Sequence, residues 1–489
     1  MLGFSVAALV FCHLLLSAAS AQEAQPGKLV IEPYVLKTFD GKEHPAELGR
    51  LSVREDREGR SNRLIQVAFV RLKTTAAKPE PPIVFLMGGP GIPGIVMGQV
   101  PVYFNLFDRL RETADVILLD QRGTGMSSPN LECSDKALMP PDMWESREKA
   151  VQEMRRRLSA CAGQWKAQGV NLAAYTTNAS ADDVDDLRRA IGADRISLLA
   201  FSYGTELALA TIRRRGDSLH RVVLQGVRGP SRGATPVDQD IQIRKIAYLA
   251  ATDPGVGPQF PDMVGDLKQV LAKFDKGPIT FTVKNNQTGL PVKISVGKLG
   301  FQSWFSQNFS GPSIPALLHT MKDGDYSIFT HIVEELYNGG FGDSLMARAV
   351  NCGSRWSPER LARVKIEARD ALMGDAASVG ALELCDVVGN PDLGAEFRLP
   401  VSSTLPTLFV SGTLDMSASP LYQVEEIRWR FPNSTHIIVE NGGHELLPSP
   451  TVQSFVVDFM KGQEPARRFI LQPRPRFLSV EDAKAGKPR

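Results

Sequence analysis

The sequence has almost no net charge, few cysteines and few histidines, and each scarcity argues against a class of function. Its 489 residues include 56 Lys and Arg against 54 Asp and Glu, a net charge of +2 that gives no sign of nucleic-acid binding. The seven histidines and five cysteines show no Cys-x-x-Cys or histidine-rich spacing, so we expect no metal and no cofactor. Internal repeats are also absent, which argues against a repeat architecture.

Long apolar runs are missing except at the N-terminus. Leu2–Leu16 contains no charged side chain, and Ser17–Ala21 supplies the small residues of a cleavage site before Gln22. This pattern predicts a signal peptide over residues 1–21, cleaved after Ala21, and a secreted or periplasmic protein. A membrane anchor is the alternative. Otherwise we expect no stable membrane insertion.

Cleavage of this leader would remove Cys12 and leave four cysteines. In an exported chain this number suggests two disulfides, for which the sequence alone allows three pairings. We favour the nearest-neighbour pairs, Cys133–Cys161 and Cys352–Cys385. Each would close a loop of about thirty residues, worth roughly 3 kcal/mol in the chain-entropy model. Four buried free thiols are the alternative.

The most informative segment is Ala200-Phe201-Ser202-Tyr203-Gly204. It lies between an apolar run, Ile196–Ala200, and a helix-like run, Thr205–Arg215. This order of strand, tight turn and helix predicts a nucleophile elbow, in which Ser202 is exposed at the end of a parallel sheet. A serine that caps a buried helix is the alternative.

A serine nucleophile needs a base to take its proton and an acid to orient that base. Asp415 follows the predicted strand Leu405–Gly412, and His444 follows the predicted strand His436–Glu440. These positions have the order Ser, Asp, His that is typical of α/β-hydrolases. The nearest rival is His436, which lies within a strand pattern. Alternatively, Asp415 only forms a turn.

A glycine-rich loop, Gly88–Gly91, follows the apolar strand Ile83–Met87. Acyl transfer needs N–H groups that face the developing oxyanion, and glycines let the backbone come close. We expect these donors to be the N–H groups of Tyr203 and Gly89, with Gly91 as the second choice. A plain turn or a phosphate loop is the alternative, but no Gly-Lys-Ser/Thr follows.

Three motifs in this order resemble the proline iminopeptidase and tripeptidyl aminopeptidase family of α/β-hydrolase serine peptidases. They are Gly88–Gly91, Asp120–Gly125 and Phe201–Thr205. The resemblance covers about Pro81–Pro230 and Pro406–Phe459. It implies an α/β-hydrolase fold, with a mostly parallel central sheet flanked by helices, and the triad Ser202, Asp415 and His444.

The resemblance also implies an exopeptidase that releases residues from peptide N-termini. Two positions depart from the family pattern. Met87 stands where many members have histidine, and Arg355 follows Cys352 where members carry an acidic pair suited to a substrate's ammonium. Carboxylic esters are therefore alternative substrates, and a non-catalytic binding protein is a third hypothesis. The candidate amine anchors are Glu334, Glu335, Asp343, Glu383 and Asp386.

At this length the chain suggests two domains. We expect residues 22–231 to form the first part of the hydrolase core, with leading antiparallel strands, and residues 400–471 to form the second part. Residues 232–399 are predicted to be an inserted, mainly helical cap, which in such enzymes selects substrates. Residues 472–489 form a basic tail. A capping box at Ser180–Asp183 predicts a helix whose first-turn aspartates suit the helix dipole better than a cation site.

Overall fold

The computed structural model describes residues 25–59, 61–133, 137–231, 233–339 and 344–486. The signal peptide predicted over residues 1–21 lies outside these ranges. Among the described residues, no helix is both long enough and apolar enough to span a membrane.

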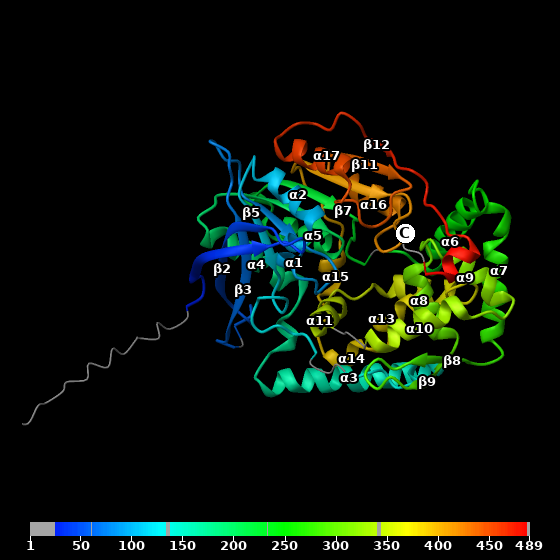
Figure 1. Ribbon diagram of the computed structural model, residues 1–489. Coiled ribbons are helices and arrows are strands. Elements are labelled where there is room, and N and C mark those ends of the chain that lie inside the picture. Colours follow the sequence, from blue (N-terminus) through cyan, green and yellow to red (C-terminus); the bar gives the residue numbers. More distant parts are fainter. Residues whose placement is uncertain (1–24, 60, 134–136, 232, 340–343, 487–489) are drawn as a thin grey trace, which may run out of the picture.

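The fold is built on a ten-stranded sheet with the strand order β1-β2-β3-β5-β4-β6-β7-β10-β11-β12 (Figure 1). The strands from β5 to β12 run parallel, while β1, β2 and β3 add antiparallel strands at one edge, as predicted for the leading segment. The bounds are β1 (Leu29–Lys37), β2 (Glu43–Arg54), β3 (Leu64–Leu72), β4 (Ile83–Leu86), β5 (Val116–Asp120), β6 (Ile196–Phe201), β7 (Leu219–Gln225), β10 (Thr407–Gly412), β11 (Ser434–Glu440) and β12 (Phe469–Leu471).

Helices cover both faces of the sheet because parallel strands need crossover connections. Neighbouring residues of one strand point to opposite faces, so Leu198 and Leu199 belong to two different apolar clusters. The first face is covered by α1 (Gly94–Gln99), α2 (Pro101–Leu110) and α17 (Pro450–Met460). The second face carries α4 (Thr177–Ala190), α5 (Tyr203–Arg215) and α16 (Leu421–Arg428), whereas α3 (Arg147–Ala167) lies farther from the sheet, against α14 (Cys385–Val388) (Figure 1).

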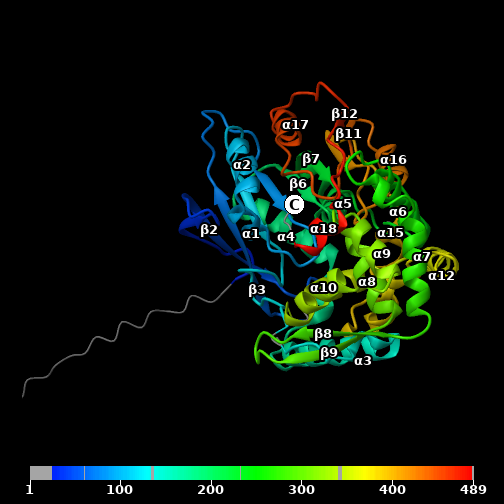
Figure 2. The same ribbon diagram turned by 45° about the vertical axis from the view of Figure 1, so that its right-hand side comes forward.

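Between β7 and β10 the chain forms a block of helices beside the sheet (Figure 2). We call this block, residues 233–399, the cap. It has its own apolar core, in which the rings of Phe301, Phe305 and Phe309 stack. Its hairpin pairs β8 (Ile279–Lys284) with β9 (Pro291–Val296). Its helices are α6 (Pro236–Ala251), α7 (Met263–Phe274), α8 (Lys298–Asn308), α9 (Ile314–Lys322), α10 (Ser327–Gly339), α11 (Leu345–Gly353), α12 (Pro358–Glu367), α13 (Val379–Glu383), α14 (Cys385–Val388) and α15 (Gly394–Arg398).

The C-terminal tail returns to the cap after β12. The N–H of Leu478 donates to the carbonyl of Pro312 at 2.9 Å. The short helix α18 (Val480–Lys484) packs on α9, and its Lys484 pairs with Asp325. The described part of the tail therefore lies against the surface of the cap.

One sequence prediction was wrong in its detail. Helix α4 is capped by Thr176, whose hydroxyl accepts from the N–H of Ala179 at 3.2 Å, so the helix begins before the predicted cap at Ser180. The aspartates are consequently inside the helix and neutralise arginines. The buried guanidinium of Arg122 holds Asp183 with two hydrogen bonds, of 2.6 and 2.7 Å.

Both favoured cysteine pairs are disulfides in the structure. Cys133–Cys161 ties α3 to the segment before it. Cys352–Cys385 joins α11 to α14 inside the cap. Two bonds of this kind suit an oxidising compartment outside the cytosol.

We expect the chain from Gln22 onwards to contain no titratable thiol under denaturing, non-reducing conditions. Replacing Cys352 and Cys385 together by serine should lower the free energy of unfolding by about 2–5 kcal/mol, because the unfolded chain gains freedom. Thiol titration and urea unfolding measure the two effects. Two or more reactive thiols per chain would contradict the pairing.

Candidate active site

Ser202 occupies the turn between β6 and α5, as the elbow pattern predicts. Its backbone has φ 54° and ψ −124°, a conformation that a residue with a side chain rarely adopts. Such strain persists only where the surroundings enforce it, and it is typical of functional turns. The Ser202 N–H donates to the carbonyl of Gln225 in β7 at 2.9 Å, which holds the turn against the neighbouring strand.

Two glycines are needed for this turn to fit. A Cβ at Gly204 would overlap the carbonyl oxygen of Leu86 in β4. A Cβ at Gly88 would lie 2.5 Å from the Cβ of Ser202. Ala200, where the common motif has glycine, is fully buried in the core beside these positions. The turn therefore packs directly on the end of β4, and only the second glycine of the usual motif is sterically required.

The other two predicted triad residues lie together. Nδ1 of His444 is 2.9 Å from each carboxylate oxygen of Asp415. The Asp415 carboxylate also accepts the N–H groups of Ser417 and Ala418, at 2.9 and 3.1 Å. This arrangement fixes the orientation of the imidazole and leaves its Nε2 outside the pair.

Contacts also tie His444 to the nucleophile turn. The ring of Phe201, which precedes Ser202, lies 5.0 Å from the imidazole ring between their centroids. The side-chain amide of Gln225 donates to the carbonyl of His444 at 2.7 Å. A Cβ at Gly226 would come within 2.9 Å of the imidazole Cε1, so this glycine makes room for the histidine. The three predicted residues thus follow the ends of β6, β10 and β11, and the end of β7 lies between β6 and β10 in the sheet.

The rival histidine has different surroundings. His436 is buried in β11, with Nδ1 2.5 Å from Glu425 and Nε2 3.0 Å from the hydroxyl of Ser411. Burial lowers the pKa of His436 against the opposing influence of Glu425. Both ring nitrogens are engaged there, so His436 is a structural residue of the sheet.

The predicted oxyanion donors flank Ser202. Tyr203 is the first residue of α5, so its N–H has no acceptor within the helix. Gly89 has φ +106°, in a loop that begins next to Ser202. The cap reaches this loop, because a Cβ at Gly91 would lie 2.7 Å from the hydroxyl of Ser344 at the start of α11.

A buried ion pair beneath the nucleophile was not predicted. Glu206, one turn after Ser202, has 2% exposure and lies 3.1 Å from Nε of Arg228. Burial raises the pKa of the Glu206 carboxyl, and Arg228 opposes this rise. Arg228 also donates to the side chain of Asn351 in α11 at 2.8 Å. The pair therefore links the core to the cap.

A cavity of about 1130 Å³ lies between the cap and the core. Met416 and Ser417, which follow Asp415, form part of its wall, and so do Arg228 and Asn351. Neither Ser202 nor His444 is a lining residue, so the cavity adjoins the predicted triad and does not contain it. Trp144 and Trp304 add aromatic surface at other parts of the wall.

Two of the five candidate amine anchors, Glu334 and Glu335, do not reach this cavity. Glu334 accepts the backbone N–H of Lys284 at 2.8 Å, and Glu335 is exposed. Neither lines the cavity. Asp343 lies outside the described residues.

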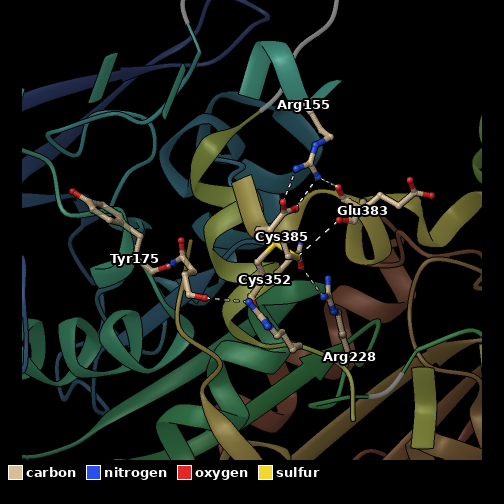
Figure 3. Close-up of a disulfide and its surroundings, with 11 residues drawn as sticks. Arg155, Tyr175, Arg228, Cys352, Glu383 and Cys385 are labelled. Atoms are coloured by element: carbon tan, nitrogen blue, oxygen red, sulfur yellow. Dashed lines mark hydrogen bonds and ion pairs between the residues drawn. A yellow bond between two sulfur atoms is a disulfide. The ribbon is translucent and has the colours of Figure 1, made fainter. Parts of the chain in front are cut away.

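The remaining two candidates are already paired with arginines of α3. Glu383 accepts from Arg147 at 2.7 Å. Asp386 lines the cavity but is held by Arg155 at 2.8 Å. Figure 3 shows Arg155 and Arg228 near the Cys352–Cys385 disulfide. In the described part of the chain, the cavity therefore has no unpaired carboxylate for a substrate's ammonium.

The α/β-hydrolase fold family model matches residues 81–449, which is most of the chain. The chain belongs to this family. The putative hydrolase YuaR of Escherichia coli is 28% identical over 173 residues, covering 34% of this chain and 31% of its own length. The serine protease Hip1 of Mycobacterium tuberculosis is 27% identical over 206 residues, covering 40% and 38%.

The tripeptidyl aminopeptidase of Streptomyces lividans is 27% identical over 216 residues, which cover 40% of this chain and 39% of that enzyme. The matches thus span less than half of each relative. Among solved structures, a thermophilic esterase from Thermogutta terrifontis aligns at TM-score 0.35 with 16% identity, covering 84% of this chain and 98% of its own. The family model and the names of the curated relatives support the hydrolase family and leave the peptidase subfamily to be tested.

Replacing Arg228 by methionine should destabilise the fold by about 3–5 kcal/mol at pH 8, because Glu206 then remains buried without its counterion. The loss should be smaller at pH 5. A carboxyl whose pKa is raised in the folded state takes up a proton more readily there than in the unfolded state, so stability falls as pH rises. Urea unfolding at both pH values measures this difference.

The double variant Glu206→Gln with Arg228→Met is the matched control. It carries no buried charge at either position, so its loss of stability should depend little on pH. An equal loss for Arg228→Met at pH 5 and pH 8 would contradict a buried, ionised Glu206.

Proposed function

We propose that this protein is an exported serine hydrolase that removes short acyl segments from peptide N-termini. The observation that carries the proposal is the strained Ser202 turn beside the hydrogen-bonded pair of His444 and Asp415. Export is supported by the leader pattern of the sequence and by the two disulfides.

In this proposal Ser202 Oγ attacks the substrate carbonyl while His444 Nε2 takes its proton. Asp415 holds the imidazole in the required tautomer and stabilises the imidazolium. The N–H groups of Tyr203 and Gly89 stabilise the oxyanion. His444 then returns the proton to the leaving nitrogen or oxygen, which leaves an acyl ester on Ser202. Water, deprotonated by His444, hydrolyses that ester and regenerates the hydroxyl.

Peptide substrates are supported by the relatives named serine protease and tripeptidyl aminopeptidase. The resemblance of the sequence to the proline iminopeptidase family supports the same hypothesis of a peptide substrate.

Carboxylic esters are the second candidate class. A specific observation favours them: the carboxylate on the cavity wall, Asp386, is already paired with Arg155. Arg355 also lines the cavity, and it follows Cys352 where the family pattern that the sequence resembles has an acidic pair. An ester substrate requires no ammonium anchor, so these features do not disfavour it.

Ser202→Ala should lower kcat by about 10⁴-fold or more, because the variant lacks the nucleophile. A fluorophosphonate probe should label Ser202 in the native protein and no other serine. The kcat of His444→Ala and of Asp415→Asn should also fall by several orders of magnitude. The control variant, His436→Gln, leaves the triad intact and should therefore retain its kcat. Labelling at a different serine would overturn the assignment.

A second experiment addresses the substrate's terminus. Ala-Ala-Ala-4-nitroanilide and its N-acetylated twin share one scissile bond and differ in terminal charge. A carboxylate anchor would favour the free amine by about two orders of magnitude. Arg355 lines the cavity, and the carboxylate on the cavity wall, Asp386, is already paired with Arg155. We therefore expect the preference for the free amine to be absent or reversed. Steady-state kcat/KM values decide, and a strong preference for the free amine would show that an anchor acid exists.

A further inference from the structure

Positive charge dominates the wall of the cavity between cap and core. Its charged lining residues in the described part of the chain are Arg228, Arg348, Arg355, Arg360 and Asp386. Two of these charges are already compensated, because Arg228 pairs with Glu206 and Asp386 pairs with Arg155. Arg355 follows α11 and Arg360 lies in the first turn of α12, so this part of the cap contributes much of the positive charge of the wall.

Arg360 has no direct ion pair with a carboxylate in the described part of the chain. Its guanidinium donates to the carbonyls of Gly233 and Ala234, at 2.9 and 3.2 Å, and its Nε is buried without a partner. The carboxylate of Asp238 acts on Arg360 only as a nearby charge, which favours the charged guanidinium and opposes its desolvation. Desolvation lowers the pKa of Arg360 to about 10, which expresses the cost of holding the charge there. An anion in the cavity would offset that cost.

Arg355 lies between α11 and α12 and has N–H donors that are not used within the described part of the protein. Its Nε donates to the carbonyl of Cys352 at 3.1 Å, and its Nη2 is 3.5 Å from the carbonyl of Asn390. A guanidinium has five N–H donors, so several remain for a ligand. The bond to Cys352 fixes the side chain beside the Cys352–Cys385 disulfide, so it is positioned before a ligand arrives.

Trp356 separates the two arginines in sequence and lines the same wall. Its ring centre lies 4.9 Å from the guanidinium carbon of Arg360. This contact orients the planar group, and a planar guanidinium matches the two oxygens of a carboxylate. The indole also offers an apolar surface for the carbon chain that would lead to such a carboxylate.

We propose that Arg355 and Arg360 bind a carboxylate at the far end of the substrate's acyl segment. The proposal rests on the proposed function, because it treats the cavity next to Asp415 as the acyl-binding pocket. In an enzyme that acts at peptide N-termini, the short end of the substrate is the acyl part. We place this acyl part in the cavity. The preferred substrate then carries an acidic acyl end, whether the scissile bond is an amide or an ester.

The test compares substrates that differ only in this charge. One pair is N-succinyl-Ala-Ala-Ala-4-nitroanilide and its N-acetyl twin. The other is the mono-4-nitrophenyl ester of glutaric acid and the methyl ester of that compound. The informative pair is the one whose scissile bond, amide or ester, the enzyme cleaves. Within that pair we expect kcat/KM to be about ten- to a hundredfold higher for the substrate that carries the carboxylate. Equal rates within both pairs would overturn the proposal.

Variants assign the effect to residues. Arg355→Gln and Arg360→Gln should each reduce the carboxylate-to-neutral ratio by about tenfold, whereas the lysine variants should retain part of it. Arg363→Gln is the matched control, because Arg363 is on α12, pairs with Glu367 and does not line the cavity. A ratio that is unchanged in both glutamine variants would overturn the assignment. Arg355→Gln serves if Arg360→Gln does not fold, because Arg355 is the more exposed of the two side chains.

A binding measurement separates this proposal from the proposed function. Calorimetry on Ser202→Ala should show at least tenfold tighter binding of a succinyl-tripeptide amide than of its acetyl twin, and 0.5 M NaCl should weaken that difference. Equal binding of the two peptides would refute the carboxylate site even if Ser202 is the nucleophile. Conversely, selective binding without fluorophosphonate labelling of native Ser202 would refute the hydrolase mechanism alone.

Discussion

The packing of one tight turn against the end of β4 determines how the remaining site is built. Ser202 has a positive φ, and the turn around it fits only because Gly204 and Gly88 leave no side chain between it and β4. Any Cβ at Gly204 would overlap the backbone of Leu86, so relaxing the turn would require the central strands to separate. The fully buried apolar strands on both sides oppose such separation, and their packing thus sustains the strain at the serine.

The same constraint organises the neighbouring strands. Because β6, β7, β10 and β11 run parallel, their carboxyl ends meet at one edge, where the predicted nucleophile, acid and base follow β6, β10 and β11. β7 contributes Gln225, whose backbone carbonyl binds the Ser202 N–H and whose side chain binds the carbonyl of His444. A strand that supplies no predicted catalytic residue therefore sets the spacing of two that do.

Features encoded within a few consecutive residues could be predicted from the sequence. The turn at Ser202 and the loop positions of Asp415 and His444 belong to this class. The disulfides do not, because they join cysteines 28 and 33 residues apart, but pairing nearest neighbours in sequence was sufficient to predict them. Other features that depend on distant partners could not be predicted. The ion pair of Asp183 was missed because its partner, Arg122, lies 61 residues earlier in the chain. The partners of the cap acids were hidden because the arginines that neutralise them lie on α3, more than two hundred residues earlier.

The buried Arg228 gives the cap and the nucleophile one continuous set of bonds. The Thr205 hydroxyl donates to the carbonyl of Ser202 at 2.6 Å and accepts the Arg228 N–H at 2.7 Å. The Arg228 guanidinium binds Glu206 below the nucleophile and Asn351 in the cap. Asn351 precedes Cys352, whose carbonyl holds Arg355. A cap joined only by apolar contacts could slide, whereas these directional bonds keep the arginines at a set distance from Ser202. Under the proposed binding of a carboxylate by Arg355 and Arg360, the length of an acyl segment would be selected together with its charge.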